Sequence, residues 1–289
     1  MRSVVRISDG LGNQLFQYAF GYGFARKTGQ EIVLDPFFWG TSLRSYQLNQ
    51  FRIKYTDRFV SPVWDYILGL GPRNARRYKE KYRNKKIKEG YRLEVEKQSM
   101  KYDAALYQEK DPVYFQGFWQ TPNYFDEFYD EIKQQFTLNR PLSSRANIYV
   151  RQMEAGNSVS LHIRRTDYDR DVNNVCLGEE FYREAICRMK QSIGEFQLFV
   201  FTDDKNFVKS NFNLHAYTMI EGVDDIEEFV LMQKCKHHIV ANSTFSWWGS
   251  YLADHKGGVV FAPVADIWTE EFYPKEWNLI QARVGMKES

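Results

Sequence analysis

The chain has 289 residues, of which 43% are hydrophobic and 26% are charged, values typical of a globular protein with one large domain or two ordinary ones. Its formal net charge of +2 argues against a strongly basic nucleic-acid-binding protein, and its three cysteines, without CxxC spacing, support neither a disulfide framework nor a zinc site. An N-terminus without a signal-peptide pattern and the lack of a membrane-spanning apolar run favour a cytoplasmic setting.

The first residues predict a strand, a turn, a helix and a second strand. Residues 4–7 are rich in strand formers, and residues 9–12 are typical of a turn. Apolar side chains then recur at helical spacing over residues 13–27, and residues 31–35 resume a strand. This order is the unit from which parallel sheets are built, so we expect an N-terminal α/β domain over residues 1–145.

A basic segment follows within that domain. Residues 73–101 contain twelve Lys and Arg against four Asp and Glu, an excess of eight positive charges, so the near-neutral total hides an uneven distribution. We expect residues 62–101 to form a basic helical insert. A solvated helical face is one interpretation of such a run, and peripheral contact with an anionic membrane or a lipid-linked substrate is the other.

The second half alternates more regularly, and it predicts a doubly wound α/β domain over residues 146–289. Strand-like apolar runs are expected at residues 159–163, 198–201, 216–220, 238–241 and 259–262. Helices are expected at residues 179–190, 225–234 and 244–253. The fold class expected for the whole chain is therefore α/β, with two Rossmann-like domains.

Polar side chains follow three of these strands, at the edge where doubly wound sheets bind ligands. The pair Arg164 and Arg165 follows the first strand, and the pair Asp203 and Asp204 follows the second. A hydroxyl-rich helix start follows the strand at 238–241. Its candidate binding residues are Asn242, Ser243, Thr244, Phe245 and Ser246.

Together these groups suit a nucleoside diphosphate gripped between two domains. An arginine binds phosphate oxygens with two parallel hydrogen bonds, and Ser243 or Thr244 at a helix N-terminus adds donors where the helix dipole favours an anion. Asp203 or Asp204 suits the two N–H donors of guanine, and the loop at residues 10–12 offers a second approach to phosphate. The structural alternatives are a surface pair between Arg164 and Asp167 and an ordinary helix cap at Ser243.

Three other patterns are weaker. Residues 10–12 lack the third glycine of a dinucleotide-binding loop. The alternating carboxylates Asp167, Asp169 and Asp171 resemble a calcium loop but lack its glycine and terminal glutamate, so we expect Asp169 and Asp171 to be solvated. His237 and His238 are neighbours on a strand and face opposite sides, which favours structural roles over a shared metal. We therefore predict no metal and no cofactor.

Four segments resemble one family. Residues 10–19 (GLGNQLFQYA), 115–120 (FQGFWQ), 162–167 (HIRRTD) and 241–249 (ANSTFSWWG) are similar to the bacterial α-1,2-fucosyltransferases of glycosyltransferase family 11. Thr166 is a departure, since glycine is common there in the family, and threonine occurs in related fucosyltransferases that modify proteins and N-glycans. The segments extend over most of the chain, and their combination is specific.

The resemblance implies a GT-B type transferase, with two domains facing a cleft, that needs no metal. It would move L-fucose from GDP-fucose, with inversion, to the 2-hydroxyl of a terminal β-galactoside in bacterial surface-glycan synthesis. It assigns Arg164 to the diphosphate, with support from Arg165, and places Asp203 or Asp204 near guanine. It also implies donor contacts for Gly12, Asn13, Gln14, His162, Asn242, Ser243, Thr244, Phe245 and Ser246.

Other assignments stay open. Asp167 is the candidate general base for the acceptor hydroxyl, and Asp9 and Asp35 compete with it. Rings near predicted N-terminal loops, Trp39, Trp119 and Tyr124, are candidates for stacking on the acceptor, with core packing as the alternative. The functional alternatives are a fucosyltransferase of another linkage or with a protein acceptor, and a non-enzymatic sugar- or polyanion-binding protein.

Overall fold

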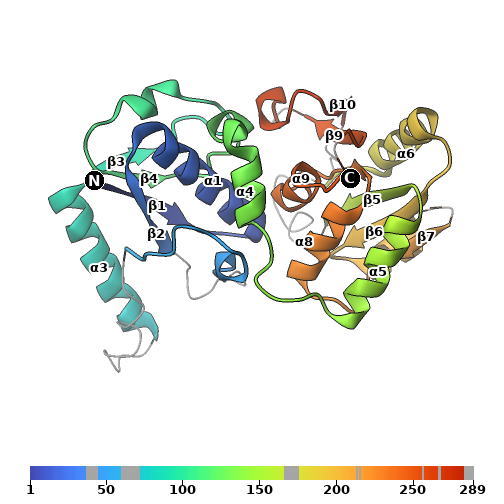
Figure 1. Cartoon of the computed structure of the whole chain (residues 1–289), viewed down its shortest axis with the longest axis horizontal. Coiled ribbons are helices and arrows are strands. Elements are labelled where there is room, and N and C mark those ends of the chain that lie inside the picture. Colours follow the sequence, from blue (N-terminus) through green and yellow to red (C-terminus); the bar gives the residue numbers. More distant parts are fainter. Residues whose placement is uncertain are drawn as a thin grey trace, which may run out of the picture. The chain divides into compact units, whose positions relative to one another are not determined.

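The computed structural model describes residues 1–36, 45–59, 72–165, 176–212, 214, 216–255, 257–265 and 268–282, with the backbone alone over 72–79. The chain divides into two compact units, Met1–Asn139 and Arg140–Ser289. Each unit contains its own parallel sheet (Figure 1). The division falls earlier than the expected boundary between residues 145 and 146.

The earlier boundary has a physical cause in the second unit. Arg140 Nη2 lies 2.6 Å from Asp224 Oδ2, and the Ser143 N–H donates to the buried Glu227 carboxylate at 2.6 Å. The Ser143 hydroxyl also accepts a hydrogen bond from the Ala146 N–H and so caps the helix that follows. Residues 140–143 are therefore tied to the second unit before its first helix begins.

The N-terminal unit is built on a parallel sheet with the order β2-β1-β4-β3. Its strands are β1 (Arg2–Ile7), β2 (Glu31–Pro36), β3 (Arg92–Val95) and β4 (Val113–Gln116). Its helices are α1 (Leu11–Thr28), α3 (Pro72–Gly90) and α4 (Tyr129–Gln135), with short 3-10 turns at Leu48–Gln50, Ala104–Gln108, Pro122–Tyr124 and Asp126–Phe128. The predicted strand–helix–strand start is confirmed. Helix α1 begins earlier than residue 13, because Asp9 adopts a left-handed φ of 67° and completes the turn.

Helix α1 is buried along most of its length between the sheet and a loop. A Cβ atom on Gly21 would lie 2.8 Å from Val5 Cγ2 in β1, and one on Gly23 would lie 2.2 Å from the carbonyl oxygen of Tyr124. The two glycines therefore let the helix approach the sheet on one side and the loop on the other. Aromatic side chains of the first unit pack around the helix, with Phe20 stacked on Trp119 at 4.3 Å between ring centroids.

The basic segment differs from the expected helical insert. Residues 72–90 form the helix α3, but residues 92–95 form β3, which pairs in parallel with β4 and belongs to the sheet. Residues 62–71 lie outside the described residues. Helix α3 packs on the sheet through a cluster of Val4, Val33, Phe59 and Tyr114, against which Ile87 of the helix rests. The segment is therefore part of the domain, with an inner face as well as a charged outer one.

The C-terminal unit is built on a parallel sheet with the order β10-β9-β8-β5-β6-β7. Its strands are β5 (Ser158–Ile163), β6 (Gln197–Thr202), β7 (Tyr217–Met219), β8 (His237–Ile239), β9 (Val260–Val264) and β10 (Asn278–Gln281). Its helices are α5 (Ser144–Ala155), α6 (Glu179–Ile193), α7 (Lys205–Asn211), α8 (Asp225–Lys234) and α9 (Thr244–Tyr251), with a 3-10 turn at Glu270–Phe272. The expected strands and helices of this half are all present.

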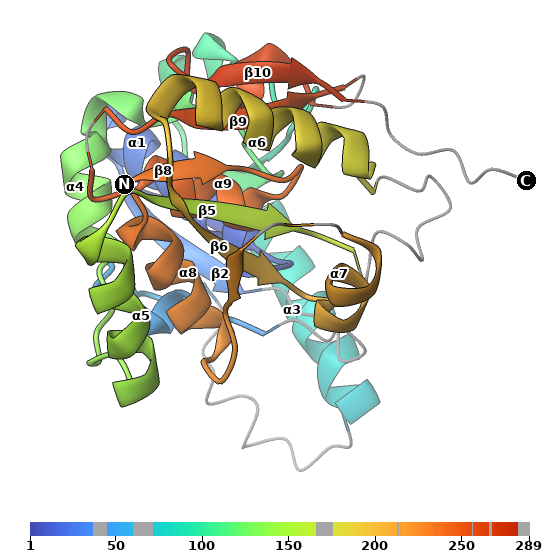
Figure 2. The same cartoon turned by 90° about the vertical axis from the view of Figure 1, so that its right-hand side faces the viewer.

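Helices cover both faces of this sheet (Figure 2). On one face, Phe181, Tyr182 and Met189 of α6 pack against β5 and β6. On the other, Tyr149 of α5 and Leu231 of α8 join a second cluster. Every residue of β5 is buried, as a central strand of a doubly covered parallel sheet requires. Among the described residues, no helix combines the length and the apolarity needed to cross a bilayer.

Candidate functional site

The carboxyl ends of β5 and β6 bring the predicted basic and acidic pairs together. The two strands are neighbours, with Ile163 opposite Thr202, so the residues that follow each strand lie side by side. Arg164 Nη1 lies 3.0 Å from Asp203 Oδ2, and the backbone N–H of Arg165 donates to Asp203 Oδ1 at 2.9 Å. Asp203 therefore fixes both the guanidinium of Arg164 and the course of the chain through Arg165.

The pair is sheltered but reachable. The side chains of Arg164 and Asp203 are 18% and 19% exposed, an environment in which a charge-assisted hydrogen bond is stronger than at an open surface. Asp167, which the sequence offered as an alternative partner of Arg164, lies outside the described residues, as do Asp169 and Asp171. Asp203, the described partner of Arg164, directly follows the neighbouring strand β6.

Arg165 and Asp204, the second residues of the basic and acidic pairs, contact other groups of the protein. The guanidinium carbon of Arg165 lies 3.3 Å from the centre of the Phe207 ring, in cation–π contact. Asp204 is the N-cap of α7, where Asp204 Oδ1 accepts a hydrogen bond from the Phe207 N–H at 3.0 Å. The structure thus gives Asp204 a helix-capping role and places the Arg165 guanidinium over the Phe207 ring.

We predict that Asp203→Asn lowers turnover about tenfold or more. An asparagine can still accept from the Arg165 N–H, but it has no charge to hold the Arg164 guanidinium in place. The measurement is kcat and donor KM for Asp203→Asn beside Asp204→Asn, which should lower thermal stability through a weaker cap with a smaller effect on kcat. Equal kcat losses in the two variants would contradict a positioning role specific to Asp203.

Helix α9 begins at the same edge of the sheet. Ser243 precedes the helix, but its side chain makes no capping hydrogen bond, so the ordinary-cap alternative for this residue is wrong. Asn242, Ser243 and Ser246 are nearly buried, and the Ser246 hydroxyl donates to the Ser243 carbonyl at 3.3 Å. Ser246 therefore stabilises the first turn of α9. The more accessible residues here are Thr244 and Phe245.

His162 and Phe245 meet next to these groups. His162 is the penultimate residue of β5 and is 5% exposed, and its ring centre lies 5.9 Å from that of Phe245. Phe229 of α8 packs on Phe245, with the two ring centres 5.7 Å apart. The structure therefore brings together the sequence-predicted residues of β5, β6 and α9 on one edge of one sheet.

The remaining motif residues pack rather than bind. Trp247 and Trp248 are fully buried, and the Trp247 indole N–H donates to the Phe272 carbonyl at 2.8 Å. A Cβ atom on Gly249 would lie 2.9 Å from Met232 Cβ, so the glycine sets the close approach of α9 to α8. This part of the motif fixes where the first turn of α9 stands.

Glu228 of α8 is a candidate that the sequence did not indicate. Burial raises its pKa to about 7, Lys205 opposes that rise, and the nearby carboxylates Asp225, Asp203 and Asp224 add to it. Its electrostatic coupling to Asp203 and Lys205 places it near the same edge. In the sequence Glu228 is one of several acidic residues at a helix start, and its neighbour Glu227 is a buried structural carboxylate bonded to Ser143.

We predict that Glu228→Gln is more stable than the wild type at pH 8 and equally stable near pH 4.5. A raised carboxyl pKa means that the folded state binds the proton more tightly than the unfolded state, so stability falls as the pH rises from 4.5 through about 7. A neutral glutamine removes that loss. Melting temperatures across this range provide the measurement, with Glu154→Gln on exposed α5 surface as the control. A Glu228→Gln variant destabilised equally at every pH would contradict the prediction.

The N-terminal candidates lie in the other unit, at the start of α1. Asn13 Oδ1 accepts a hydrogen bond from Gln120 Nε2 at 3.0 Å, and Gly12 is buried within the helix. Gln14 is fully buried, and its amide donates to the carbonyls of Asp9 and Ser45, both at 2.8 Å. Its side chain thus organises the loops around β1 and is not presented to a ligand.

The segment at 115–120 is organised by a carboxylate. Glu96 accepts hydrogen bonds from the backbone N–H groups of Phe118 at 2.7 Å and Trp119 at 3.0 Å. Burial raises the pKa of Glu96, while these two bonds lower it. A Cβ atom on Gly117 would lie 2.4 Å from Glu96 Cβ, which explains the glycine. In this chain the segment is therefore a turn held by Glu96.

Several candidate acceptor and base residues have other roles. Trp119 and Tyr124 are buried in the aromatic core of the first unit, so the stacking role proposed for them is wrong and the packing alternative is confirmed. Trp39 lies outside the described residues. Asp35 is fully buried and forms an ion pair with Arg83. A general base must reach a substrate hydroxyl, so this buried carboxylate does not suit that role.

The histidine pair is structural. His238 is buried, its Nδ1 lies 2.8 Å from the Ser160 hydroxyl, and burial lowers its pKa to about 3. His237 has separate partners, with Nε2 at 3.0 Å from Asn157 Oδ1 and Nδ1 accepting from the Val259 N–H at 2.9 Å. Within the part of the chain that the structure describes, no group of three His, Cys, Asp or Glu side chains is arranged as metal ligands.

Comparison with known proteins decides the family. The sequence profile of Glycosyl transferase family 11 matches residues 3–281. The chain belongs to glycosyltransferase family 11. It is 31% identical to an "Alpha-1,2-colitosyltransferase" of Escherichia coli, over 96% of this chain and 98% of that protein. It is 30% identical to the "O-antigen biosynthesis glycosyltransferase WbnK" of Escherichia coli, over 89% of this chain and 92% of that protein.

Solved structures agree on the fold of this family 11 protein. Fucosyltransferase NodZ from Bradyrhizobium superposes with a TM-score of 0.52 and 13% identity, over 87% of this chain and 93% of that one. NodZ α-1,6-fucosyltransferase soaked with GDP-fucose gives a TM-score of 0.51 at 12% identity, over 87% of this chain and 92% of that one. The expected fold class, two α/β domains with parallel sheets of the GT-B type, is confirmed.

Proposed function

We propose that this family 11 glycosyltransferase moves L-fucose from GDP-β-L-fucose to the 2-hydroxyl of a terminal β-galactoside, with inversion, in bacterial surface-glycan synthesis. The observation that carries the proposal is the arginine pair at the end of β5, with Arg164 fixed by Asp203 beside the first turn of α9. The GDP-fucose soaked into the NodZ crystals and the galactoside α-(1,2)-fucosyltransferase 2 of Rattus norvegicus, 26% identical over 49% of this chain, support this choice of donor and linkage.

In the proposed reaction the acceptor oxygen forms a bond to C1 of fucose while the bond from C1 to the phosphate oxygen breaks. The electron pair goes to GDP, and the Arg164 guanidinium with the N–H groups of the first turn of α9 neutralises it. The acceptor proton passes to a base, for which we retain Asp167. A loose transition state needs little proton transfer to that base before the C1–O bond breaks. Asp203 is engaged by Arg164 and Arg165, and Asp204 caps α7, so of the carboxylates at this edge we assign guanine to Glu228.

A second donor is favoured by one observation. The colitosyltransferase relative matches nearly the full length of both chains, and colitose is the 3-deoxy form of fucose. GDP-colitose differs from GDP-fucose only in lacking the 3-hydroxyl of the sugar, so the site described above suits either donor. The preference between the two donors depends on whether the site contacts the 3-hydroxyl of the sugar.

The test is a donor and acceptor screen. The protein is incubated with GDP-fucose or GDP-colitose and a panel of β-galactosides, GDP release is followed, and the product linkage is determined by NMR. The proposal expects an α-1,2-linked fucoside and activity that persists with a chelator. A different linkage or a protein acceptor would reject the regiochemistry, and activity lost to the chelator and restored by Mg²⁺ or Mn²⁺ would reject the metal-free reaction. Salt-sensitive sugar binding without GDP release, unaffected by Arg164→Ala, would favour the binding-protein alternative.

A further inference from the structure

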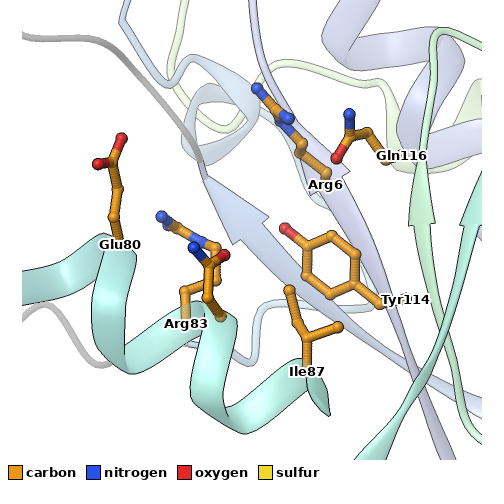
Figure 3. A pocket seen from close by; sticks show the side chains of 7 residues that line it. Arg6, Glu80, Arg83, Ile87, Tyr114 and Gln116 are labelled. Atoms are coloured by element: carbon orange, nitrogen blue, oxygen red, sulfur yellow. The ribbon is translucent and has the colours of Figure 1, made fainter.

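A polar cavity is lined entirely by residues of the N-terminal unit. Its volume is about 280 Å³, near the lower end of small-molecule sites (Figure 3). One wall is formed by Arg6, Tyr114 and Gln116 from β1 and β4, and the other by side chains of α3. Arg6 and Gln116 stand at the carboxyl ends of adjacent parallel strands, the edge at which such sheets bind ligands.

The helical wall is a single stripe of α3. Glu80, Arg83, Asn84 and Ile87 are spaced by three and four residues, so their side chains lie on one face of the helix. This face carries a carboxylate, an amide and an aliphatic side chain beside one arginine, so it is less basic than the segment as a whole. The stripe therefore separates a specific inner surface from the charged outer surface of the same helix.

The cavity is organised in advance by a buried ion pair. Arg83 donates to both carboxylate oxygens of Asp35, from Nη2 to Oδ1 at 2.9 Å and from Nε to Oδ2, and the Tyr114 hydroxyl donates to Oδ2 at 2.6 Å. Asp35 is fully buried and Arg83 is 7% exposed. Removing two charges from water costs several kcal/mol per ion, and apolar residues of similar volume would pack as stably. Such a cluster is better explained by the rigid polar wall that it creates.

The chemistry of the walls suits an uncharged polyhydroxyl compound. The positive charges of Arg6 and Arg83 are balanced by the negative charges of Glu80 and Asp35, so the cavity has no excess charge to attract an anion. The carboxylate, amides and guanidinium offer donors and acceptors in fixed planes, which match pairs of neighbouring hydroxyls. Ile87 and the Tyr114 ring add apolar surface for the C–H face of a sugar ring.

We propose that this cavity binds one sugar ring of the acceptor glycan and so determines acceptor specificity, an inference that rests on the proposed transfer to a glycan. The residues that touch the sugar are Arg6, Glu80, Asn84 and Gln116, and Arg83 is a positioning residue fixed by Asp35. The basic segment then contributes to recognition through its inner stripe.

The test compares Glu80→Gln and Asn84→Ala with the matched control Glu89→Gln, whose carboxylate lies on the same helix, 66% exposed, and pairs with Lys85. Acceptor KM, donor KM and the rate of GDP-fucose hydrolysis without acceptor are measured with lactose or methyl β-D-galactoside. We expect acceptor KM to rise about tenfold in each cavity variant, the effect of one lost hydrogen bond to a charged or fixed partner. Donor KM, hydrolysis and melting temperature should stay near wild-type values, and the control should behave as wild type.

Each other outcome has a defined meaning. Unchanged acceptor KM in both cavity variants, or a change confined to donor KM, would overturn the assignment. If the wild type neither hydrolyses nor transfers, the proposed function fails, and saturation-transfer NMR with the same galactosides tests the cavity alone: a signal lost in the Glu80→Gln, Asn84→Ala double variant supports it, and no signal in the wild type overturns it. A signal displaced by inorganic pyrophosphate and lost in Arg6→Met but not in Glu80→Gln would identify an anion site and reject the sugar.

Discussion

Replacing Arg164 by alanine should lower kcat by about 10²–10³-fold, the loss measured when one fixed donor to a developing negative charge is removed. The physical reason is that the Arg164 guanidinium, 3.0 Å from Asp203, supplies the fixed positive charge that neutralises GDP in the proposed reaction. Arg164→Lys should recover only part of the rate, since an ammonium group cannot form two parallel bonds to phosphate. GDP release at saturating donor and acceptor provides the measurement.

The matched control is Arg188→Ala, which removes an exposed arginine paired with Glu184 on α6, far along the chain from the strand ends. Both variants should melt within a few degrees of the wild type, because Asp203 keeps its hydrogen bond to the Arg165 N–H when the Arg164 side chain is removed. Near-normal turnover in Arg164→Ala would remove this residue from the proposed mechanism.

Asp35→Ala should destabilise the protein by about 3–5 kcal/mol, the usual cost of breaking a buried ion pair from one side. The variant leaves the guanidinium of Arg83 buried without its carboxylate and deprives the Tyr114 hydroxyl of its acceptor. Urea denaturation followed by fluorescence gives the free energy of unfolding. Because the pair also forms the wall of the cavity beside α3, acceptor KM should rise in the same variant.

A double variant distinguishes charge burial from lost packing. In Asp35→Leu, Arg83→Met both charges are replaced by apolar side chains of similar length, so we expect it to be more stable than Asp35→Ala. Tyr114→Phe, which removes one hydrogen bond, should cost about 1 kcal/mol. Equal losses in the single and double variants would show that packing, and not an uncompensated charge, dominates at this position.

The second unit was predictable because its signals are local. Buried parallel strands such as β5 and β6 are continuous apolar runs, and the residues that end them lie on one edge whatever the details of packing. Strand β3 was missed because it is an edge strand with alternating charges, Arg92 and Glu94, which resemble a solvated segment. Its place in the sheet depends on pairing with β4.

The finer roles in the site depend on contacts between residues distant in the chain. Nothing near Asp203 in the sequence indicates that its carboxylate binds Arg164 and Arg165. Arg165 lies 38 residues earlier in the chain. The family resemblance implied a donor contact for Gln14, but its amide is used by the Ser45 carbonyl and the Gln47 N–H. The raised pKa of Glu228 likewise arises from burial, which spacing alone does not reveal.

In the proposed reaction, the ion pair between Arg164 and Asp203 has a consequence for product release. A guanidinium that binds a diphosphate tightly also slows the departure of the product, and product release limits many transferases that close around a nucleotide. Asp203, 3.0 Å away, offers the guanidinium a carboxylate to which it returns when GDP leaves. In the proposed cycle the charge of Arg164 therefore stays paired between one turnover and the next.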